Sequence, residues 1–458
     1  MPAFTELNQL NQAEIDNLNQ LGYSQMTAIQ EKSLPHALNG QDLIAQAKTG
    51  SGKTAAFGIP LLHKLNQRFF GVQALVLCPT RELASQVADE LRKLARFQAN
   101  IKIVVLCGGV GIGPQIASME KGAHVVVGTP GRIQDHLRKG TLQIDQVETL
   151  VLDEADRMLD MGFYEEISQI VAHTPKARQT LLFSATYPDN IAQLSADLQR
   201  EPVSIKVEST HQATSIEQHL LISDGKERND TLFKAIRHFD IQQAVIFCNT
   251  KQSVEDLSSA LKNQGFTALA LHGDMEQRDR DEIYVRFKNN SSHFLVATDV
   301  AARGLDVNDL PAVINYELPR DPEVYVHRIG RTGRAGKSGL ALSLASPKED
   351  YKIAAIEDQI KAHVPKLDVD KLVDNQGFIP KPAMITLCFA AGKKDKLRPG
   401  DILGALTGKD GIDGKQVGKI DVLDYLAYVA VERKSAAQAL EHLQKTRIKN
   451  KNIRVRRV

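Results

Sequence analysis

Short runs of apolar residues alternate with longer segments of helical spacing along most of the chain. The runs cover residues 75–78, 103–106, 125–127, 150–152 and 181–183, and they resume at 245–248, 268–271, 294–297 and 313–315. Hydrophobicity within each run is continuous rather than alternating, which is typical of strands buried on both faces of a parallel sheet. The intervening segments, such as 81–97 and 251–264, have the length and spacing of helices. This alternation predicts doubly wound α/β domains.

The pattern weakens at two places, and both predict domain boundaries. Residues 208–216 are polar and aperiodic, which indicates a linker between a first α/β domain at 1–207 and a second at 217–365. Turn-forming residues within 366–380 indicate a second linker. The remaining segment, 381–458, has short strands around two helical stretches and predicts a separate α+β domain of βαββαβ order.

Composition narrows the class of protein. Hydrophobic residues make up 42% and charged residues 24% of the 458 positions, which excludes a disordered chain, a collagen-like fibre and a coiled-coil rod. No apolar run approaches the ~18 residues of a membrane helix, and the first residues lack a secretory signal pattern, so we expect a cytoplasmic location. The four cysteines lie apart at the ends of apolar runs, so we expect reduced, buried thiols and no structural zinc.

The net charge of +2 conceals an asymmetry along the chain. Residues 381–458 contain 17 basic and 8 acidic side chains, a balance of +9, and the rest of the chain has a balance of −7. A basic domain attached to a near-neutral body favours a polyanionic partner.

The segment Ala47-Lys48-Thr49-Gly50-Ser51-Gly52-Lys53-Thr54 lies between a strand-like run and a helical one. Its spacing is that of a phosphate-binding P-loop with Ala47 in place of the first glycine. Gly50 and Gly52 let backbone N–H groups turn toward phosphate oxygens. Lys53 can neutralise the β- and γ-phosphates, and the Thr54 hydroxyl is placed to ligate Mg²⁺.

A second acidic motif, Asp153-Glu154-Ala155-Asp156, follows the apolar run at 150–152. The carboxyl end of a buried strand is where α/β folds bind ligands. We expect Asp153 to hold Mg²⁺ through water, and Glu154 to orient and deprotonate an attacking water. A pair of acidic residues often only begins a solvated helix, but the P-loop in the same domain favours the catalytic interpretation.

From residue 4 to about 345 the sequence resembles the DEAD-box RNA helicases. Phe4 and the segment 22–30, with Tyr23 and Gln30, resemble the Q motif that reads adenine in the family, although Met26 stands where proline is usual. Ser184-Ala185-Thr186 resembles the motif that couples hydrolysis to unwinding. The segments that resemble RNA-backbone motifs contain Pro79, Thr80, Arg81, Gly109, Thr129 and Arg132.

The resemblance continues in the second domain, which has no P-loop of its own. Asn249, Gln277 and Arg280 lie in segments that resemble RNA-contacting motifs. The segment 297–306 resembles one that touches RNA and nucleotide; it contains Thr298, Asp299, Arg303, Gly304 and Asp306. The segment 327–334 resembles the arginine-finger motif and contains Arg331 and Arg334, which can present guanidinium groups to a γ-phosphate.

The resemblance implies two RecA-like domains that close on ATP, Mg²⁺ and single-stranded RNA. Closure completes the ATPase site, in which we expect catalytic roles for Lys53, Glu154, Arg331, Arg334, Ser184 and Thr186. It also bends one RNA strand, so that a short duplex opens locally. The residue types of the RNA motifs suit backbone contact rather than base reading, so the core should show little sequence preference.

The C-terminal segment 393–408 resembles the RNA-recognition module of DbpA-type helicases, a branch of this family. In that branch the module grips a hairpin of large-subunit ribosomal RNA and acts in assembly of that subunit. Tyr428 fits a base-stacking role and a core position equally well, since the module lacks the full aromatic signature of an RNA-recognition motif (RRM). The cations that we expect to contact phosphates are Lys393, Lys394, Lys396, Arg398, Arg454 and Arg456.

Three functions are compatible with these features. The first is an ATP-dependent RNA helicase that remodels ribosomal RNA, the second a DNA-directed translocase of the same superfamily, and the third a non-catalytic ribosome-binding factor. The acidic motif and Gln30 favour RNA over DNA. Intact Lys53 and Glu154, together with Arg331 and Arg334, argue against a non-catalytic factor.

Overall fold

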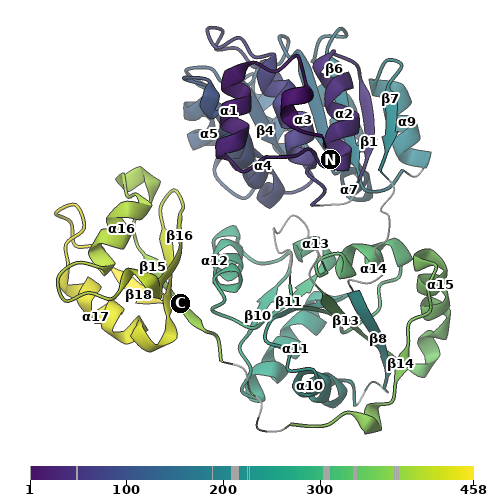
Figure 1. The fold of residues 1–458 in the computed structure, drawn as a ribbon, viewed down its shortest axis with the longest axis vertical. Coiled ribbons are helices and arrows are strands. Elements are labelled where there is room, and N and C mark those ends of the chain that lie inside the picture. Colours follow the sequence, from purple (N-terminus) through teal and green to yellow (C-terminus); the bar gives the residue numbers. More distant parts are fainter. Residues whose placement is uncertain are drawn as a thin grey trace. The chain divides into compact units, whose positions relative to one another are not determined.

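The computed structural model describes residues 2–47, 50–187, 189–207, 216–223, 225, 227–302, 310–333, 338–375, 377, 379 and 381–458. The chain separates into two compact units. The first unit contains the N-terminal α/β domain, and the second contains the other α/β domain and the C-terminal domain (Figure 1). No helix of the described part of the chain is both long and apolar enough to cross a membrane.

A seven-stranded parallel sheet forms the centre of the first unit, in the order β3-β4-β2-β5-β6-β1-β7. Its strands are β1 (Leu43–Gln46), β2 (Ala74–Leu77), β3 (Ile103–Leu106), β4 (Val125–Gly128), β5 (Thr149–Asp153), β6 (Gln179–Ser184) and β7 (Val203–Lys206). Its helices are α1 (Gln12–Gln20), α2 (Ala28–Leu38), α3 (Lys53–His63), α4 (Arg81–Leu94), α5 (Ile112–Met119), α6 (Pro130–Arg138), α7 (Ala155–Asp160), α8 (Tyr164–Ala172) and α9 (Asp189–Leu198).

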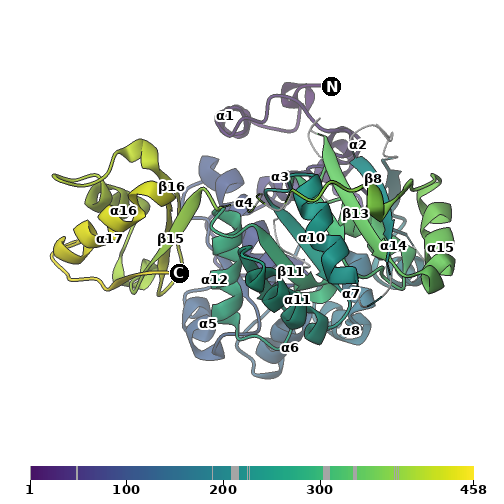
Figure 2. The ribbon, with the colours of Figure 1, turned by 90° about the horizontal axis from the view of Figure 1, so that it is seen from below.

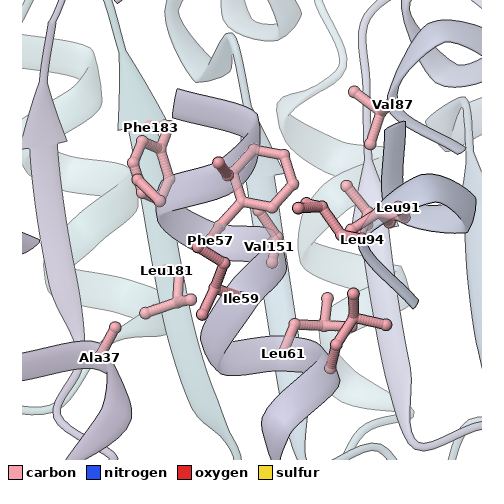
Figure 3. Packing of buried hydrophobic residues seen from close by; sticks show 14 of the residues in the cluster. Ala37, Phe57, Ile59, Leu61, Val87, Leu91, Leu94, Val151, Leu181 and Phe183 are labelled. Carbon is pink, nitrogen blue, oxygen red and sulfur yellow. The ribbon is translucent and has the colours of Figure 1, made fainter. Parts of the chain in front are cut away.

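The continuous apolar strands are buried because helices cover both faces of this sheet. Val151 and Phe183 belong to one apolar cluster with α3 and α4, whereas Leu150 and Leu152 belong to a second cluster on the opposite face. Figure 3 shows side chains of the first cluster, in which the rings of Phe57 and Phe183 meet edge to face at 5.3 Å between centroids. Each fully buried side chain of this kind stabilises the fold by about 1.5–3 kcal/mol.

The second unit contains a parallel sheet of the same size, in the order β10-β11-β9-β12-β13-β8-β14. Its strands are β8 (Ile216–Ile222), β9 (Ala244–Cys248), β10 (Ala268–Leu271), β11 (Phe294–Thr298), β12 (Ala312–Asn315), β13 (Gly339–Ala345) and β14 (Lys366–Leu367). Its helices are α10 (Arg228–His238), α11 (Lys251–Asn263), α12 (Gln277–Lys288), α13 (Asp299–Ala302), α14 (Pro322–Ile329) and α15 (Asp350–Ile360). Two RecA-like parallel-sheet domains were predicted, and the structure confirms them.

The first part of the segment 366–380, which was expected to be a linker, is part of the second domain. Lys366 and Leu367 pair with Leu220 and Leu221 of β8, and Leu372 is 5% exposed within the core of the second domain. These residues therefore belong to the second domain, because Lys366 and Leu367 pair with one of its strands and Leu372 is buried in its core. The other expected linker, at 208–216, lies almost entirely outside the described residues, which resume at Ile216 in β8.

The C-terminal domain has the predicted βαββαβ order. Its elements are β15 (Met384–Phe389), α16 (Pro399–Leu406), β16 (Val417–Val422), β17 (Ala427–Glu432), α17 (Ala436–Lys445) and β18 (Val455–Arg457), and its antiparallel sheet has the order β16-β17-β15-β18. Inward side chains such as Phe389 and Val429 pack on Ile402 and Leu443 of the two helices. All four cysteines of the chain are buried and free, as expected.

Candidate nucleotide and RNA sites

The topology of the first sheet separates the sequence motifs into two groups along one edge. The P-loop follows β1, Ser184 ends β6 and Asp153 ends β5, and these three strands are neighbours in the sheet. The Ala47 amide donates to the Ser184 carbonyl oxygen at 3.0 Å, which holds the start of the P-loop beside the end of β6. Because parallel strands end at the same edge, the nucleotide motifs lie together although about 130 residues of sequence separate the first from the last.

The other half of the same edge carries the predicted RNA motifs. Thr80 follows β2, Gly109 follows β3 and Thr129 follows β4, and these three strands are again neighbours. Thr80 caps α4 by accepting from the Leu83 amide at 3.3 Å, and Gly109 has a φ of 76°. The sheet order therefore places the motifs predicted to bind nucleotide and those predicted to bind RNA side by side along one edge.

Two buried groups of opposite charge lie at the nucleotide end of the sheet. Lys53 is 6% exposed and Asp153 is 3% exposed. Lys53 Nζ and Asp153 Oδ1 have no hydrogen-bond partner among the described residues. Burial raises the pKa of the Asp153 carboxyl to about 7, against the opposing effect of Lys53. Buried charged groups without partners are costly, so this pair fits a ligand that supplies phosphate oxygens and a cation.

The Q motif lies directly against the P-loop. Gln30 is 1% exposed, and its Nε2 donates to the Gly52 carbonyl oxygen at 3.1 Å while its Oε1 accepts from the Thr27 amide at 2.9 Å. Gly52 has a φ of 93°, and a Cβ at this position would lie 2.5 Å from Gln30 Nε2. Glycine is therefore required at position 52 both by the backbone and by the close approach of Gln30.

Two aromatic residues of the predicted adenine site lie close together. The rings of Phe4 and Tyr23 meet edge to face at 6.1 Å between centroids, and Phe4 is 3% exposed. The Tyr23 hydroxyl donates to Glu90 Oε1 at 2.7 Å. The pKa of Tyr23 is raised, first by burial and then by this carboxylate. Tyr23 is thus fixed in a neutral form, and it packs against the first core cluster.

The last residue of the acidic motif, Asp156, connects β5 to the segment after β6. Its Oδ2 accepts from the amides of Ala185 and Thr186 at 3.2 and 3.0 Å, and from the Thr186 hydroxyl at 3.1 Å. Ser184 Oγ donates to the Thr186 carbonyl oxygen at 2.6 Å. The acidic motif in the sequence includes Asp156 but indicates no role for it, because only the strand pairing shows which amides it can reach.

Glu154 has an unusual backbone conformation, with φ 53° and ψ 52° at the N-terminus of α7. The left-handed region is uncommon for residues other than glycine, and such positions concentrate at functional sites. Glu154 is partly exposed whereas its neighbour Asp153 is buried, so the two carboxyl groups have different environments. This difference agrees with separate roles for them.

Arg132 organises the RNA-motif end of the first sheet. It donates to Gln115 Oε1 and to the Val110 carbonyl oxygen, both at 3.0 Å. Gln115 in turn donates to the Cys107 carbonyl oxygen at 2.8 Å, and His136 shares the Gln115 oxygen at 3.1 Å. Arg132 therefore supports the loop after β3 as well as occupying a predicted RNA motif.

In the second domain, Arg328 links the ends of three strands. It donates twice to Asp299 at 2.7 Å, to Asn249 Oδ1 at 3.0 Å and to the Glu317 carbonyl oxygen at 2.7 Å. Its guanidinium carbon also lies 5.0 Å from the centre of the Phe247 ring. Arg328 is 1% exposed, so it supports the segments that contain the predicted RNA motifs through buried hydrogen bonds. Arg328 lies in the segment that resembles the arginine-finger motif, but that resemblance predicts roles only for Arg331 and Arg334.

The remaining predicted residues of this domain are described in part. Gln277 begins α12 and donates to Asp281 at 2.8 Å, and Arg280 lies one turn further on. Thr298 ends β11, and the Arg331 carbonyl oxygen accepts from the Leu310 amide at 3.2 Å. The predicted residues outside the described part of the chain are Lys48, Thr49, Arg303, Gly304, Asp306 and Arg334.

Tyr428, for which stacking and core packing were both open, is fully buried. It forms an apolar cluster with Cys388 and with Val285 of α12. The neighbouring strand residues Phe389 and Val429 belong instead to the cluster with α16 and α17, the two helices beside the small sheet in Figure 2. Arg456 donates to Glu282 of α12 at 2.6 Å. A base cannot reach the Tyr428 ring in this arrangement. Lys393, Lys394, Lys396, Arg398 and Arg454 are exposed, as expected of phosphate contacts.

Comparisons with known proteins show which family the chain belongs to. Residues 27–194 match the DEAD/DEAH box helicase model, residues 227–336 match the helicase conserved C-terminal domain, and residues 386–457 match the DbpA RNA binding domain. The chain is 50% identical to ATP-dependent RNA helicase DbpA of Escherichia coli (strain K12) over 457 residues, covering 100% of this chain and 99% of the relative. It is 45% identical to ATP-dependent RNA helicase CshA of Listeria monocytogenes, covering 80% of this chain and 70% of that one.

Solved structures of RNA-bound proteins are also similar to the two α/β domains. S. cerevisiae Dbp5 bound to RNA and ADP BeF3 matches with a TM-score of 0.72 at 30% identity, covering 81% of this chain and 96% of that one. Mss116p bound to ssRNA and AMP-PNP matches with a TM-score of 0.70 at 31% identity, covering 79% and 78%. The chain belongs to the DEAD-box ATP-dependent RNA helicases, and its C-terminal RNA-binding domain identifies it as a member of the DbpA type.

Proposed function

We propose that this helicase remodels ribosomal RNA during assembly of the large subunit and that its C-terminal domain selects the RNA. The observation that carries the proposal is a folded, DbpA-type RNA-binding domain with a charge balance of +9, attached to a core with a balance of −7. A core that contacts the backbone does not read sequence. Selectivity for one RNA therefore has to come from the attached domain, which in DbpA-type helicases grips a large-subunit hairpin.

The buried pair at the P-loop supports binding of ATP together with Mg²⁺. Lys53 would neutralise the β- and γ-phosphates, and Thr54 and Asp153 would hold the metal ion. Mg²⁺ bound there would offset negative charge on the phosphates during hydrolysis. A divalent cation beside Asp153 also explains how a carboxyl group with a pKa of about 7 can act as a carboxylate at neutral pH. Phe4, Tyr23 and Gln30 would recognise the adenine.

Glu154 would position and deprotonate the water that attacks the γ-phosphate. Arg331 and Arg334 would stabilise the charge that develops on that phosphate, which is worth roughly 10³–10⁵ in rate in other nucleotide hydrolases. Asp156 would transmit the state of the nucleotide to Thr186 through its three hydrogen bonds.

The RNA substrate can be tested with the full chain and a panel of nucleic acids. We expect a hairpin of large-subunit ribosomal RNA to stimulate ATP hydrolysis at lower concentration than an unrelated hairpin of equal length and charge. Equal stimulation by both hairpins would contradict the ribosomal assignment, and equal stimulation by DNA would favour the translocase alternative. In the same assay, Glu154→Gln should bind ATP and RNA but not turn over, because the amide keeps the shape and loses the base.

A further inference from the structure

The C-terminal domain has three aromatic residues other than histidine, and they differ in exposure. Phe389 and Tyr428 are fully buried on opposite faces of the sheet, whereas Tyr425 is 63% exposed. An exposed tyrosine carries an apolar ring into water, so a ring held rigidly there is suited to contact a partner.

Neither face of the central strands is open to a base. Phe389 and Val429 face α16 and α17, and Cys388 and Tyr428 face Val285 of α12. The usual RRM mode, in which bases stack on sheet aromatics, is therefore closed in this domain. Contacts to RNA bases have to come from loops or from the edge of the sheet.

Tyr425 lies at the tip of the hairpin between β16 and β17. The Leu423 amide donates to the Leu426 carbonyl oxygen at 2.8 Å, so the turn is closed with Asp424 and Tyr425 at its tip. Leu423 and Leu426 pack against the Tyr428 cluster. The tip is thus anchored by apolar contacts on both sides, which limits the entropy that Tyr425 loses when a ligand binds.

A cationic turn lies directly against this tip. The amides of Lys393 and Lys394 donate to the carbonyl oxygens of Leu423 and Asp424 at 2.8 and 2.9 Å. A Cβ on Gly392 would lie 2.4 and 2.5 Å from the same two oxygens, so only glycine permits this approach. Lys393 and Lys394 are both exposed.

The charge around the tip is positive. The turn and the residues just after it contain four basic side chains, Lys393, Lys394, Lys396 and Arg398, whereas Asp395 in the turn and Asp424 in the tip are acidic. Asp395 accepts from the Gly392 amide at 3.1 Å and so holds the turn. An exposed aromatic ring on a closed turn, beside several cations, is the composition that binds single-stranded nucleic acid, since bases stack on the ring and phosphates contact the cations.

We propose that Tyr425 stacks on an unpaired RNA base while Lys393 and Lys394 contact the adjoining phosphates. This inference rests on the proposed selection of RNA by the C-terminal domain and adds a preference for RNA with an unpaired nucleotide beside its paired part. A ring has no hydrogen-bond preference among bases, so the site recognises the unpaired state more than the base identity.

The test measures RNA affinity of the full chain by fluorescence anisotropy, with a large-subunit hairpin that carries a short single-stranded flank and with the same hairpin without it. Tyr425→Ala should weaken binding of the flanked hairpin by about five-fold or more and leave the blunt one unchanged. Tyr425→Phe should bind like wild type, because it keeps the ring. Tyr351→Ala is the matched control, since Tyr351 is 70% exposed on α15.

Other outcomes overturn the inference. Equal affinity of Tyr425→Ala and wild type for the flanked hairpin would remove the stacking role, as would a loss in Tyr425→Phe as large as in Tyr425→Ala. Lys393→Ala and Lys394→Ala should each reduce the salt slope of binding by about one, and Tyr425→Ala should leave the slope unchanged. If wild type binds unrelated flanked hairpins as tightly as the ribosomal one, the proposed function fails, while the dependence on Tyr425 is still measured.

Discussion

Arg328 and Asp299 form a two-point ion pair, in which Nε and one terminal nitrogen of the guanidinium donate to the two carboxylate oxygens at 2.7 Å each. Arg328 is 1% exposed, and its remaining donors satisfy Asn249 and the backbone at Glu317. Asp299 and Asn249 belong to predicted RNA motifs, so a buried residue sets the position of groups expected to contact RNA.

Arg328→Lys should therefore destabilise the second domain and weaken RNA-stimulated ATP hydrolysis. Lysine keeps the charge but cannot donate in the fork geometry, so Asn249 Oδ1 and the Glu317 carbonyl oxygen lose the hydrogen bonds that Arg328 donates. We expect the free energy of unfolding to fall by about 3 kcal/mol, measured by urea titration. Arg138→Lys is the control, because the Arg138–Asp135 pair is exposed and its change should stay within about 0.5 kcal/mol. Similar small losses in both variants would contradict the role given to Arg328.

Gly52→Ala should weaken ATP binding strongly, with a modest loss of stability. Alanine at a φ of 93° is strained, and its Cβ would displace Gln30 from the P-loop. We expect the affinity for a fluorescent ATP analogue to fall by more than ten-fold. Gly113→Ala provides the comparison, because an added Cβ there meets no atom within 4 Å. Unchanged affinity in Gly52→Ala would show that the Gln30 contact is dispensable.

The buried His293 should make the protein less stable in mild acid. Burial lowers the pKa of its imidazole to about 4, and the nearby Arg433 acts in the same direction. An unfolded histidine titrates near 6.5, so between about pH 6.5 and 4 the unfolded chain binds the extra proton. The stabilisation by neutral His293 is present above that range and is lost as the pH falls. Melting temperatures from pH 7 to 5 should fall less steeply in His293→Gln, whereas exposed His363→Gln should follow wild type.

Val285→Asp should separate the C-terminal domain from α12. Val285 is 5% exposed against Cys388 and Tyr428, and a carboxylate there would be buried without a partner. We expect NMR relaxation to show faster tumbling of the C-terminal domain, with both sheets still folded. Val373→Asp is the matched variant, since Val373 is 68% exposed in the same unit. Unchanged tumbling in Val285→Asp would mean that the apolar contact does not hold the domain.

Much of the fold and of the nucleotide site could be predicted from sequence because the signals are local. Continuous apolar runs predicted the parallel strands. The P-loop glycines have positive φ, a backbone conformation that favours glycine, so the spacing of glycines in the sequence was enough to predict the loop. The prediction that residues 366–380 form a linker was wrong for the first of these residues, because the contacts that place them are not local. Leu367 and Leu372 join the second domain through strand pairing and packing with distant residues, which short-range patterns do not reveal.

The sequence by itself determined the two parallel-sheet domains, the basic C-terminal domain and the chemistry at the strand ends. Tertiary structure decided which of these residues meet. Alternation along β17 placed Tyr428 on one face, but only the packing of α12 closed that face and left Tyr425 as the exposed ring. Likewise, Asp156 and Arg328 acquire their partners from neighbouring strands. Strand order and domain packing depend on the sum of many long-range contacts, so such partners appear only once the chain is folded.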